Sequence, residues 1–227
     1  MRQPDWDLVI FDCDGVLIDS ELLTIDVEVA LLAEAGVAIT ADEIIERYVG
    51  ISMKEMIADL EARFACSLGD EFAVRHARQV RDAFERGLEA MPGVTAVLAG
   101  VPGKICVASS SSPERLRHTL GIAGLYERFN SHIFSASMVP RGKPAPDLFL
   151  YAAERMDAAA PRCLVIEDSI PGIEAAASAG MTAIGFTGGS HCRAGHAARL
   201  GAAGGAMTVE SMSEMLPAMA ALSRRLR

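Results

Sequence analysis

The chain lacks the features that mark membrane, secreted or nucleic-acid-binding proteins. No apolar run approaches the roughly 20 residues needed to cross a bilayer, and the first residues, MRQPDWD, do not resemble a signal peptide. Lys and Arg (21) are outnumbered by Asp and Glu (30), and the formal net charge of −9 disfavours nucleic acid and anionic membranes as partners. We expect a cytoplasmic protein whose attraction for any anionic substrate is local.

Cysteine and aromatic residues are also scarce. The five cysteines are odd in number and lack metal-site spacing. Cys13, Cys106 and Cys163 lie in or beside apolar runs, which indicates small buried thiols in a reducing compartment. Aromatic content is 5% against a hydrophobic content of 51%, so the core must be mostly aliphatic. With 227 residues, the chain can form one large domain or two modest ones.

One stretch, LVIFDCDGVLIDSE at residues 8–21, organises the rest of the chain. Its apolar start, Leu8 to Phe11, predicts a strand buried on both faces of a parallel sheet. Asp12 and Asp14 follow at a spacing that points both side chains the same way, and Gly15 permits a tight turn. Adjacent carboxylates repel each other unless a cation lies beside them, and Mg²⁺ suits such a pair. A solvated acidic turn is the alternative.

The pattern from residue 20 to residue 90 is helical, without a convincing strand. Thr40 and Glu43 have the spacing of a capping box for one of these helices. We expect helices at about 22–35, 41–48, 52–64 and 70–88.

Short β-rich runs alternate with helical ones after residue 91, which favours a doubly wound parallel sheet of the α/β class. The first strand belongs to this sheet by character, so the helical stretch is an insertion. We expect a core of residues 1–18 and 92–227 and an inserted helical cap domain of residues 19–91. The expected strands are 104–108, 132–135, 163–166, 182–186 and 206–209, and the expected helices are 114–120, 147–156 and 173–179, with helix plus loop at 194–205.

Polar residues follow the predicted strands, at the edge where open parallel sheets bind ligands. The second strand leads into Ser109 to Ser112 and a helix start, which together make an anion site, although one serine is expected to cap the helix. Lys143 follows the third strand, between a glycine and a proline, with a surface lysine as the alternative. Glu167 and Asp168 follow the fourth strand; either could complete a metal site, or they could be helix-start charges.

These motifs resemble, in content and in order, those of the haloacid dehalogenase superfamily of aspartyl-phosphate phosphohydrolases. The chain looks most like the phosphatases with a helical cap inserted after the first strand, the group that includes β-phosphoglucomutase. The resemblance covers essentially the whole chain and rests on DxDG at Asp12 to Gly15, on Ser109, on Lys143 in GKPAPD, and on the sequence Glu167-Asp168-Ser169.

The resemblance implies a role for each motif residue. Asp12 would be the nucleophile and a metal ligand, and Asp14 the general acid and base, with its backbone carbonyl on Mg²⁺. Asp168 would be a further ligand, with Glu167 in or next to that ligand set. Ser109 and Lys143 would hold the phosphoryl oxygens.

Some positions depart from the family's patterns. True dehalogenases lack the second aspartate, so Asp14 argues against dehalogenation. Thr24 stands where the mutase has a histidine used in transfer, and Val49 and Met53 stand where the mutase cap has basic residues. The resemblance therefore favours hydrolysis. Substrate contacts are expected from cap residues and one core serine, namely Glu21, Gly50, Ile51, Ser52, Lys54 and Ser110; ordinary helix-start roles are the alternative for the cap residues.

The sequence thus predicts a Mg²⁺-dependent phosphatase that acts on a small phosphorylated metabolite such as a sugar, polyol or sugar-acid phosphate. A phosphosugar mutase and a non-catalytic phosphometabolite-binding protein are the alternatives. We expect a monomer or weak homodimer with no nucleic-acid or membrane partner.

Overall fold

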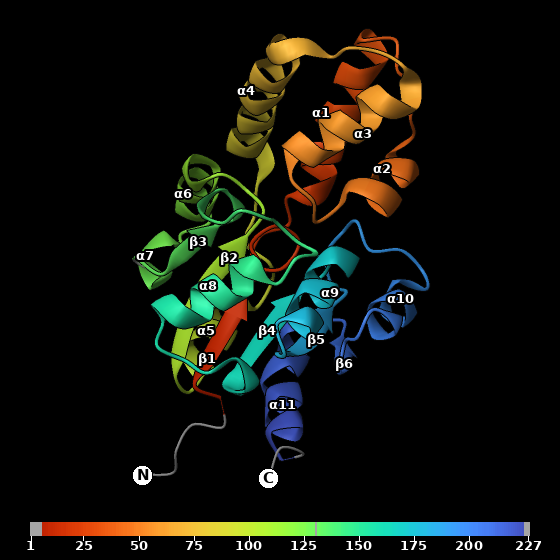
Figure 1. The fold of residues 1–227 in the computed structure, drawn as a ribbon. Coiled ribbons are helices and arrows are strands. Elements are labelled where there is room, and N and C mark those ends of the chain that lie inside the picture. Colours follow the sequence, from red (N-terminus) through yellow and green to blue (C-terminus); the bar gives the residue numbers. More distant parts are fainter. Residues whose placement is uncertain (1–5, 130, 225–227) are drawn as a thin grey trace.

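A six-stranded parallel sheet forms the centre of the computed structural model, which describes residues 6–129 and 131–224 (Figure 1). The strand order is β3-β2-β1-β4-β5-β6, and every pair is parallel. This confirms the predicted doubly wound α/β fold, since the order reverses direction at β1. The strands are β1 (Leu8–Phe11), β2 (Lys104–Ser109), β3 (Ile133–Ser135), β4 (Cys163–Glu167), β5 (Thr182–Phe186) and β6 (Met207–Val209).

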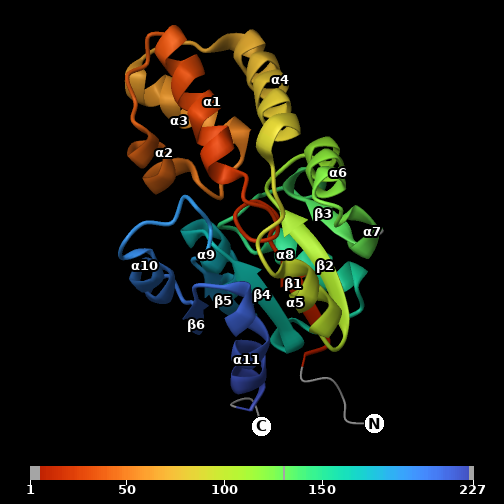
Figure 2. The same ribbon diagram turned by 180° about the vertical axis from the view of Figure 1, so that it is seen from behind.

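Helices cover both faces of the sheet, as Figures 1 and 2 show from opposite sides. The helices α5, α6, α7 and α11 share one hydrophobic core with one face, and α8, α9 and α10 share another core with the opposite face. Their bounds are α5 (Val94–Gly100), α6 (Pro113–Ile122), α7 (Tyr126–Phe129), α8 (Asp147–Arg155), α9 (Ile170–Ser178), α10 (His196–Ala202) and α11 (Met212–Ser223), with short 3₁₀ turns at Ala136–Met138 and Ala160–Arg162.

The strand β1 is buried on both faces because its side chains alternate between these two cores. Val9 and Phe11 point into the first, and Leu8 and Ile10 into the second. All four are 2% exposed or less. The predicted burial of the first strand, and of Cys13, Cys106 and Cys163, is confirmed.

Four helices between β1 and β2 stand apart from the sheet, above the carboxyl end of β1 (Figures 1 and 2). They bury a hydrophobic core of their own that includes Ile25, Leu32 and Leu60. Thr40 and Ser52 each make a complete capping box, with Glu43 and Glu55 respectively, so the predicted cap at Thr40 is confirmed. The helices are α1 (Glu21–Glu34), α2 (Ala41–Tyr48), α3 (Met53–Phe64) and α4 (Gly69–Gly87).

The two chain segments that join these helices to the sheet run side by side. The Asp19 amide donates to the Glu89 carbonyl (3.1 Å), and the Met91 amide donates to the Leu17 carbonyl (2.9 Å). The domain limits at residues 18/19 and 91/92 fall here and stay a prediction. Within the described residues, no helix has both the length and the apolar character needed to cross a membrane.

Candidate active site

Lys143 joins the ends of two neighbouring strands. Its Nζ donates to Asp12 Oδ1 at 2.8 Å and to Glu167 Oε1 at 2.7 Å, and the lysine is 1% exposed. The alternative of a surface lysine is therefore wrong. Burial lowers the pKa of the Lys143 ammonium, but the two carboxylates outweigh it and hold that pKa above its usual value. A permanent positive charge thus lies beside Asp12.

A buried acidic cluster surrounds this charge. Asp12, Glu167 and Asp168 each place a carboxylate oxygen within 4.8 Å of the others. Burial raises the pKa of Asp12 well above its usual value against the attraction of Lys143, and burial next to Glu167 raises that of Asp168. One lysine cannot neutralise three carboxylates.

The donor set of the cluster fits a hard divalent cation. Asp168 Oδ2 is buried and has no hydrogen-bond partner among the described residues. Both oxygens of Glu167, in contrast, accept hydrogen bonds: Oε1 from Lys143, and Oε2 from the amide (2.7 Å) and hydroxyl (2.8 Å) of Ser169. Asp12 and Asp168 therefore have more oxygen capacity left for a cation than Glu167 has.

Asp14 lies in a different environment, although it is only two residues from Asp12. Its Oδ1 accepts from the Ser20 hydroxyl (2.6 Å) and Arg115 Nη2 (3.0 Å), and its Oδ2 accepts from the Ser111 hydroxyl (2.7 Å). Burial favours the neutral carboxyl, but the Arg115 guanidinium and the two hydroxyls outweigh it and lower the pKa of Asp14. The two aspartates of the DxD pair thus have pKa values shifted in opposite directions.

The four serines after β2 have four different contacts. Ser109 is buried, and its Oγ accepts from the Ser111 amide (3.1 Å). Ser110 Oγ donates across to the Gly50 carbonyl (2.9 Å), and Ser111 donates to Asp14. Ser112 caps α6 by accepting from the Arg115 amide (3.2 Å), so the expected helix cap is confirmed there.

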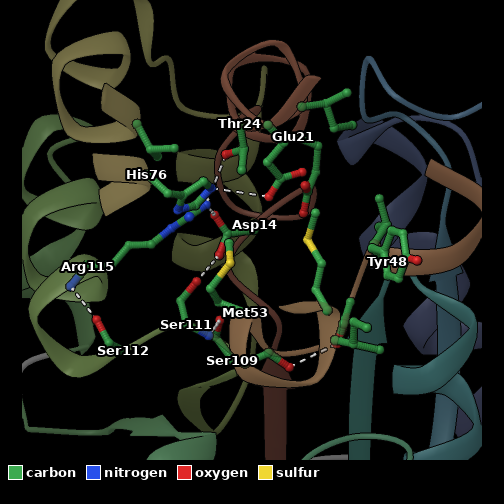
Figure 3. Close-up of a pocket in the computed structure, with 18 of the residues that line it drawn as sticks. Asp14, Glu21, Thr24, Tyr48, Met53, His76, Ser109, Ser111, Ser112 and Arg115 are labelled. Atoms are coloured by element: carbon green, nitrogen blue, oxygen red, sulfur yellow. Dashed lines mark hydrogen bonds and ion pairs between the residues drawn. The ribbon is translucent and has the colours of Figure 1, made fainter. Parts of the chain in front are cut away.

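A cavity of about 250 Å³ lies between these serines and helices α1–α4 (Figure 3). Its sheet side contains Asp12, Asp14 and Ser109 to Ser112. Its opposite side is largely apolar, with a buried pair formed by His76 Nε2 and Glu28 Oε1 at 3.3 Å. This volume suits a small molecule and excludes a folded macromolecule.

The structure places some predicted cap residues on this cavity and others away from it. Glu21, Gly50 and Ile51 line it. Ser52 is not in the lining and caps α3, and Lys54 is exposed. The predicted substrate contacts of Ser52 and Lys54 stay a prediction, without support from this arrangement.

The pKa of the Glu21 carboxyl is shifted by burial. Desolvation, reinforced by the Asp14 charge, raises the pKa of Glu21 to about 8. The side chain is therefore protonated at neutral pH, and a protonated carboxyl can donate as well as accept a hydrogen bond.

Arg115 is the residue that sequence reasoning missed. Figure 3 shows it reaching from α6 toward Asp14 and Thr24, and its Nη2 also donates to the Thr24 hydroxyl (3.1 Å). The guanidinium lies over the Phe84 ring at 4.9 Å. Arg115 lies three residues after the helix cap Ser112, on the same side of the first turn of α6. This spacing is the sequence signal that could have revealed it. Its guanidinium places a positive charge in the lining of the cavity.

Known proteins resemble this chain in sequence and in fold. The family model of the haloacid dehalogenase-like hydrolases matches residues 6–180. The chain belongs to this family. The sequence resemblance is thereby confirmed, and so is the expectation of a hydrolase at the level of the family.

Curated relatives of this haloacid dehalogenase-like hydrolase are named as phosphatases and as a mutase. The 6-phosphogluconate phosphatase of Escherichia coli (strain K12) is 29% identical over 81% of this chain and 83% of the relative. The β-phosphoglucomutase of Bacillus subtilis (strain 168) is 31% identical over 78% of this chain and 81% of the relative. The phosphatase names agree with the predicted enzyme class, a phosphoric monoester hydrolase.

Solved structures of the family share the fold across nearly the whole chain. A conserved haloacid dehalogenase-like protein of unknown function from Agrobacterium tumefaciens str. C58 has a TM-score of 0.84 and 37% identity, covering 96% of this chain and 99% of that one. A family hydrolase from Deinococcus radiodurans R1, with bound phosphate and sodium, has a TM-score of 0.74 and 33% identity, covering 96% of each.

Proposed function

We propose that this family member is a Mg²⁺-dependent phosphatase that hydrolyses a small phosphorylated metabolite through a phosphorylated Asp12. The observation that carries the proposal is the contrast within the DxD pair. Asp12 contacts the buried Lys143 ammonium, while Asp14 contacts Arg115 and two hydroxyls. Two nearby carboxylates with different environments are what a nucleophile and a separate acid and base require.

In the proposed reaction, an oxygen of Asp12 attacks phosphorus and the bond from phosphorus to the leaving oxygen breaks. Asp14 gives a proton to that oxygen. Asp14 then takes a proton from water, whose oxygen attacks phosphorus and releases Asp12 and inorganic phosphate. Because Arg115 stabilises the anionic form of Asp14, proton donation requires the Arg115 contact to lengthen when substrate enters.

Asp12, Asp168 and the Asp14 carbonyl are the proposed holders of Mg²⁺, which neutralises charge on the transferring phosphoryl group when bound. Lys143 and Ser109 hold the phosphoryl oxygens. Glu167 orients Lys143, since both of its own oxygens already accept hydrogen bonds.

The proposed substrate class is a sugar, polyol or sugar-acid phosphate. The cavity volume of about 250 Å³ matches a molecule of that size, and Glu21, Thr24 and the pair formed by Glu28 and His76 offer partners for hydroxyl groups. The names of the relatives, a 6-phosphogluconate phosphatase among them, support the same class.

The experiment measures phosphate release across a panel of sugar, polyol and sugar-acid phosphates, with Mg²⁺ and with EDTA. We expect metal-dependent release that falls at least about 10³-fold in Asp12→Asn, because the nucleophile is lost. Asp26→Asn, an exposed change on α1, is the matched control and keeps full activity. Folded protein that releases no phosphate from any substrate contradicts the proposal.

A mutase is the second candidate, because the β-phosphoglucomutase of Bacillus subtilis is among the relatives. Thr24, which accepts from Arg115 rather than presenting an imidazole, argues against it. The two candidates separate in one assay: a mutase isomerises a sugar phosphate with little release of phosphate.

A further inference from the structure

A second cluster of metal-binding side chains lies beside the acidic one. His191 and Cys192 follow β5, and His196 begins α10. A ring nitrogen of each histidine and the Cys192 Sγ all lie within 4.8 Å of one another. The histidines are buried, at 0% and 9% exposure, and Cys192 is half-buried.

The distances in this cluster match those between ligands around one tetrahedral zinc ion. His191 Nε2 is 3.6 Å from Cys192 Sγ and 3.1 Å from Asp168 Oδ2. Zinc bonds are about 2.3 Å long to sulfur and about 2.0–2.1 Å long to nitrogen or oxygen. In a tetrahedral site, these lengths separate a sulfur from a nitrogen ligand by about 3.5 Å and a nitrogen from an oxygen ligand by about 3.3 Å. Asp168 Oδ2 therefore lies at a distance from His191 Nε2 that two ligands of one ion share.

Two buried atoms here are unsatisfied, one on His191 and one on Asp168, the residue that is also a proposed Mg²⁺ ligand. His191 Nδ1 and Asp168 Oδ2 lack hydrogen-bond partners among the described residues. His191 Nε2 lies 3.1 Å from Asp168 Oδ2, but the angle between the two groups does not allow a hydrogen bond. Both side chains are buried. Leaving Asp168 Oδ2 unsatisfied in this way is costly unless a cation or another ligand completes it.

The surrounding chain holds both histidine rings in place. A Cβ atom on Gly15 would lie 3.0 Å from the His191 ring, and one on Gly189 would lie 2.8 Å from it, so two glycines leave room for the ring. His196 Nε2 lies 2.5 Å from the Asp168 carbonyl oxygen. A hydrogen bond from one ring nitrogen to a carbonyl is the contact that orients histidine ligands in metal sites.

We infer that His191, Cys192, His196 and Asp168 bind one Zn²⁺ ion, and that this ion inhibits the enzyme by withdrawing Asp168 from the Mg²⁺ site. A thiolate and two imidazoles select zinc over magnesium, which prefers oxygen ligands. Binding releases the thiol proton to solvent. The inhibitory part rests on the proposed Mg²⁺-dependent function, whereas the binding part does not.

The first test titrates the metal-free protein with Co²⁺, which reports a bound thiolate by a charge-transfer absorption band. We expect a band that saturates at one equivalent, is displaced by Zn²⁺ and is lost in Cys192→Ser. Cys66→Ser is the matched control, because Cys66 is also a half-buried free cysteine but lies at the end of α3. No band in the parent, or a band that survives in Cys192→Ser, overturns the inference.

X-ray absorption of the zinc-loaded parent protein gives a second measurement that needs no variant. We expect one sulfur and three nitrogen or oxygen neighbours, and a shell without sulfur overturns the inference.

The inhibitory part is tested by Zn²⁺ titration of Mg²⁺-dependent phosphate release, with each variant compared to its own uninhibited rate. The Zn²⁺ concentration for half inhibition should rise at least about tenfold in Cys192→Ser and stay unchanged in Cys66→Ser, because only Cys192 is a ligand. Equal inhibition of the two variants overturns this part. A cobalt band in a protein that hydrolyses nothing supports the metal site and counts against the proposed function alone.

Discussion

Several buried residues in this protein carry charges that are balanced by oppositely charged neighbours. Lys143 is the strongest case, since its ammonium lies between two carboxylates that are themselves buried. Removing one partner of a buried ion pair leaves an uncompensated charge, which costs more than the pair contributed. The lysine therefore serves stability and, in the proposed reaction, phosphoryl binding.

Lys143→Met should lower the free energy of unfolding by about 3–5 kcal/mol, because Asp12 and Glu167 would stay buried without a cation. Urea unfolding in EDTA measures the change. Lys54→Met, an exposed change on α3, should alter the free energy by no more than about 0.5 kcal/mol. A loss below about 1 kcal/mol in Lys143→Met would show that the carboxylates are neutral or solvated without the lysine.

Glu21 gives a prediction for pH dependence. Its pKa is raised from 4.5 to about 8, so the folded protein keeps a proton that the unfolded chain loses near pH 4.5. Between about pH 4.5 and pH 8, folding therefore takes up a proton on Glu21. Because of this uptake, Glu21 lowers the free energy of unfolding as the pH rises through this range.

Glu21→Gln removes this effect. In metal-free protein, the melting temperature of Glu21→Gln minus that of the parent should increase from pH 5 to pH 8 and level off above pH 8. Asp26→Asn, on the exposed side of the same helix, provides the comparison. A difference that stays constant over this range would contradict the raised pKa of Glu21.

At the scale of elements, the close approach of the loop before α3 to the sheet edge depends on one glycine. Gly50 has a φ of +88° and its Cβ position lies 2.5 Å from Ser169 Cβ, so a side chain there has no room. The same loop accepts the Ser110 hydroxyl. The helical insertion is thereby held against the serines and carboxylates of the core.

Gly50→Ala should reduce phosphate release at least about tenfold, because the loop must move away from Ser169 and the site geometry changes. Gly36→Ala is a matched control: its φ is +79°, yet nothing lies within 4 Å of its Cβ position. Both changes cost about 1–2 kcal/mol of backbone strain. Urea unfolding of both variants measures the backbone strain that they share, and steady-state rates measure the added effect of the contact between residue 50 and Ser169. Equal rates for the two variants would contradict a role for this contact in activity.

At the scale of the whole molecule, the sheet brings the ends of β1, β2 and β4 to one edge. The residues at the ends of β1 and β4 form the acidic cluster, and those at the end of β2 contact Asp14 and line the cavity. Because holding Asp12, Glu167 and Asp168 together is costly, we expect the metal-free protein to be less stable than a metal-loaded one. Metal binding would then be linked to folding.

Mg²⁺ at about 100 times its dissociation constant should stabilise the protein by about 2.7 kcal/mol, or about 5–10 °C in melting temperature. Thermal unfolding with and without EDTA measures this. The shift should disappear in Asp168→Asn and persist in Asp82→Asn, an exposed position on α4. A full shift in Asp168→Asn would remove Asp168 from the proposed ligands.

Local patterns determined the strands, most helices and the DxDG, serine, lysine and Glu-Asp motifs, because periodicity, caps and breakers act within a few residues. Three helices escaped this reasoning: α5 is short and rich in β-branched residues, α7 has only four residues, and α11 contains Pro217. Apolar burial against the sheet stabilises all three.

Only the tertiary structure decided the environments of the motif residues. Lys143 meets Asp12 across 131 residues of chain, and Arg115 meets Asp14 across 101. The convergence of His191 on Asp168 likewise depends on the packing of separate strands. Sequence spacing cannot reveal such contacts, because they form where the packed sheet brings distant strand ends together, and burial there sets the charge each side chain carries.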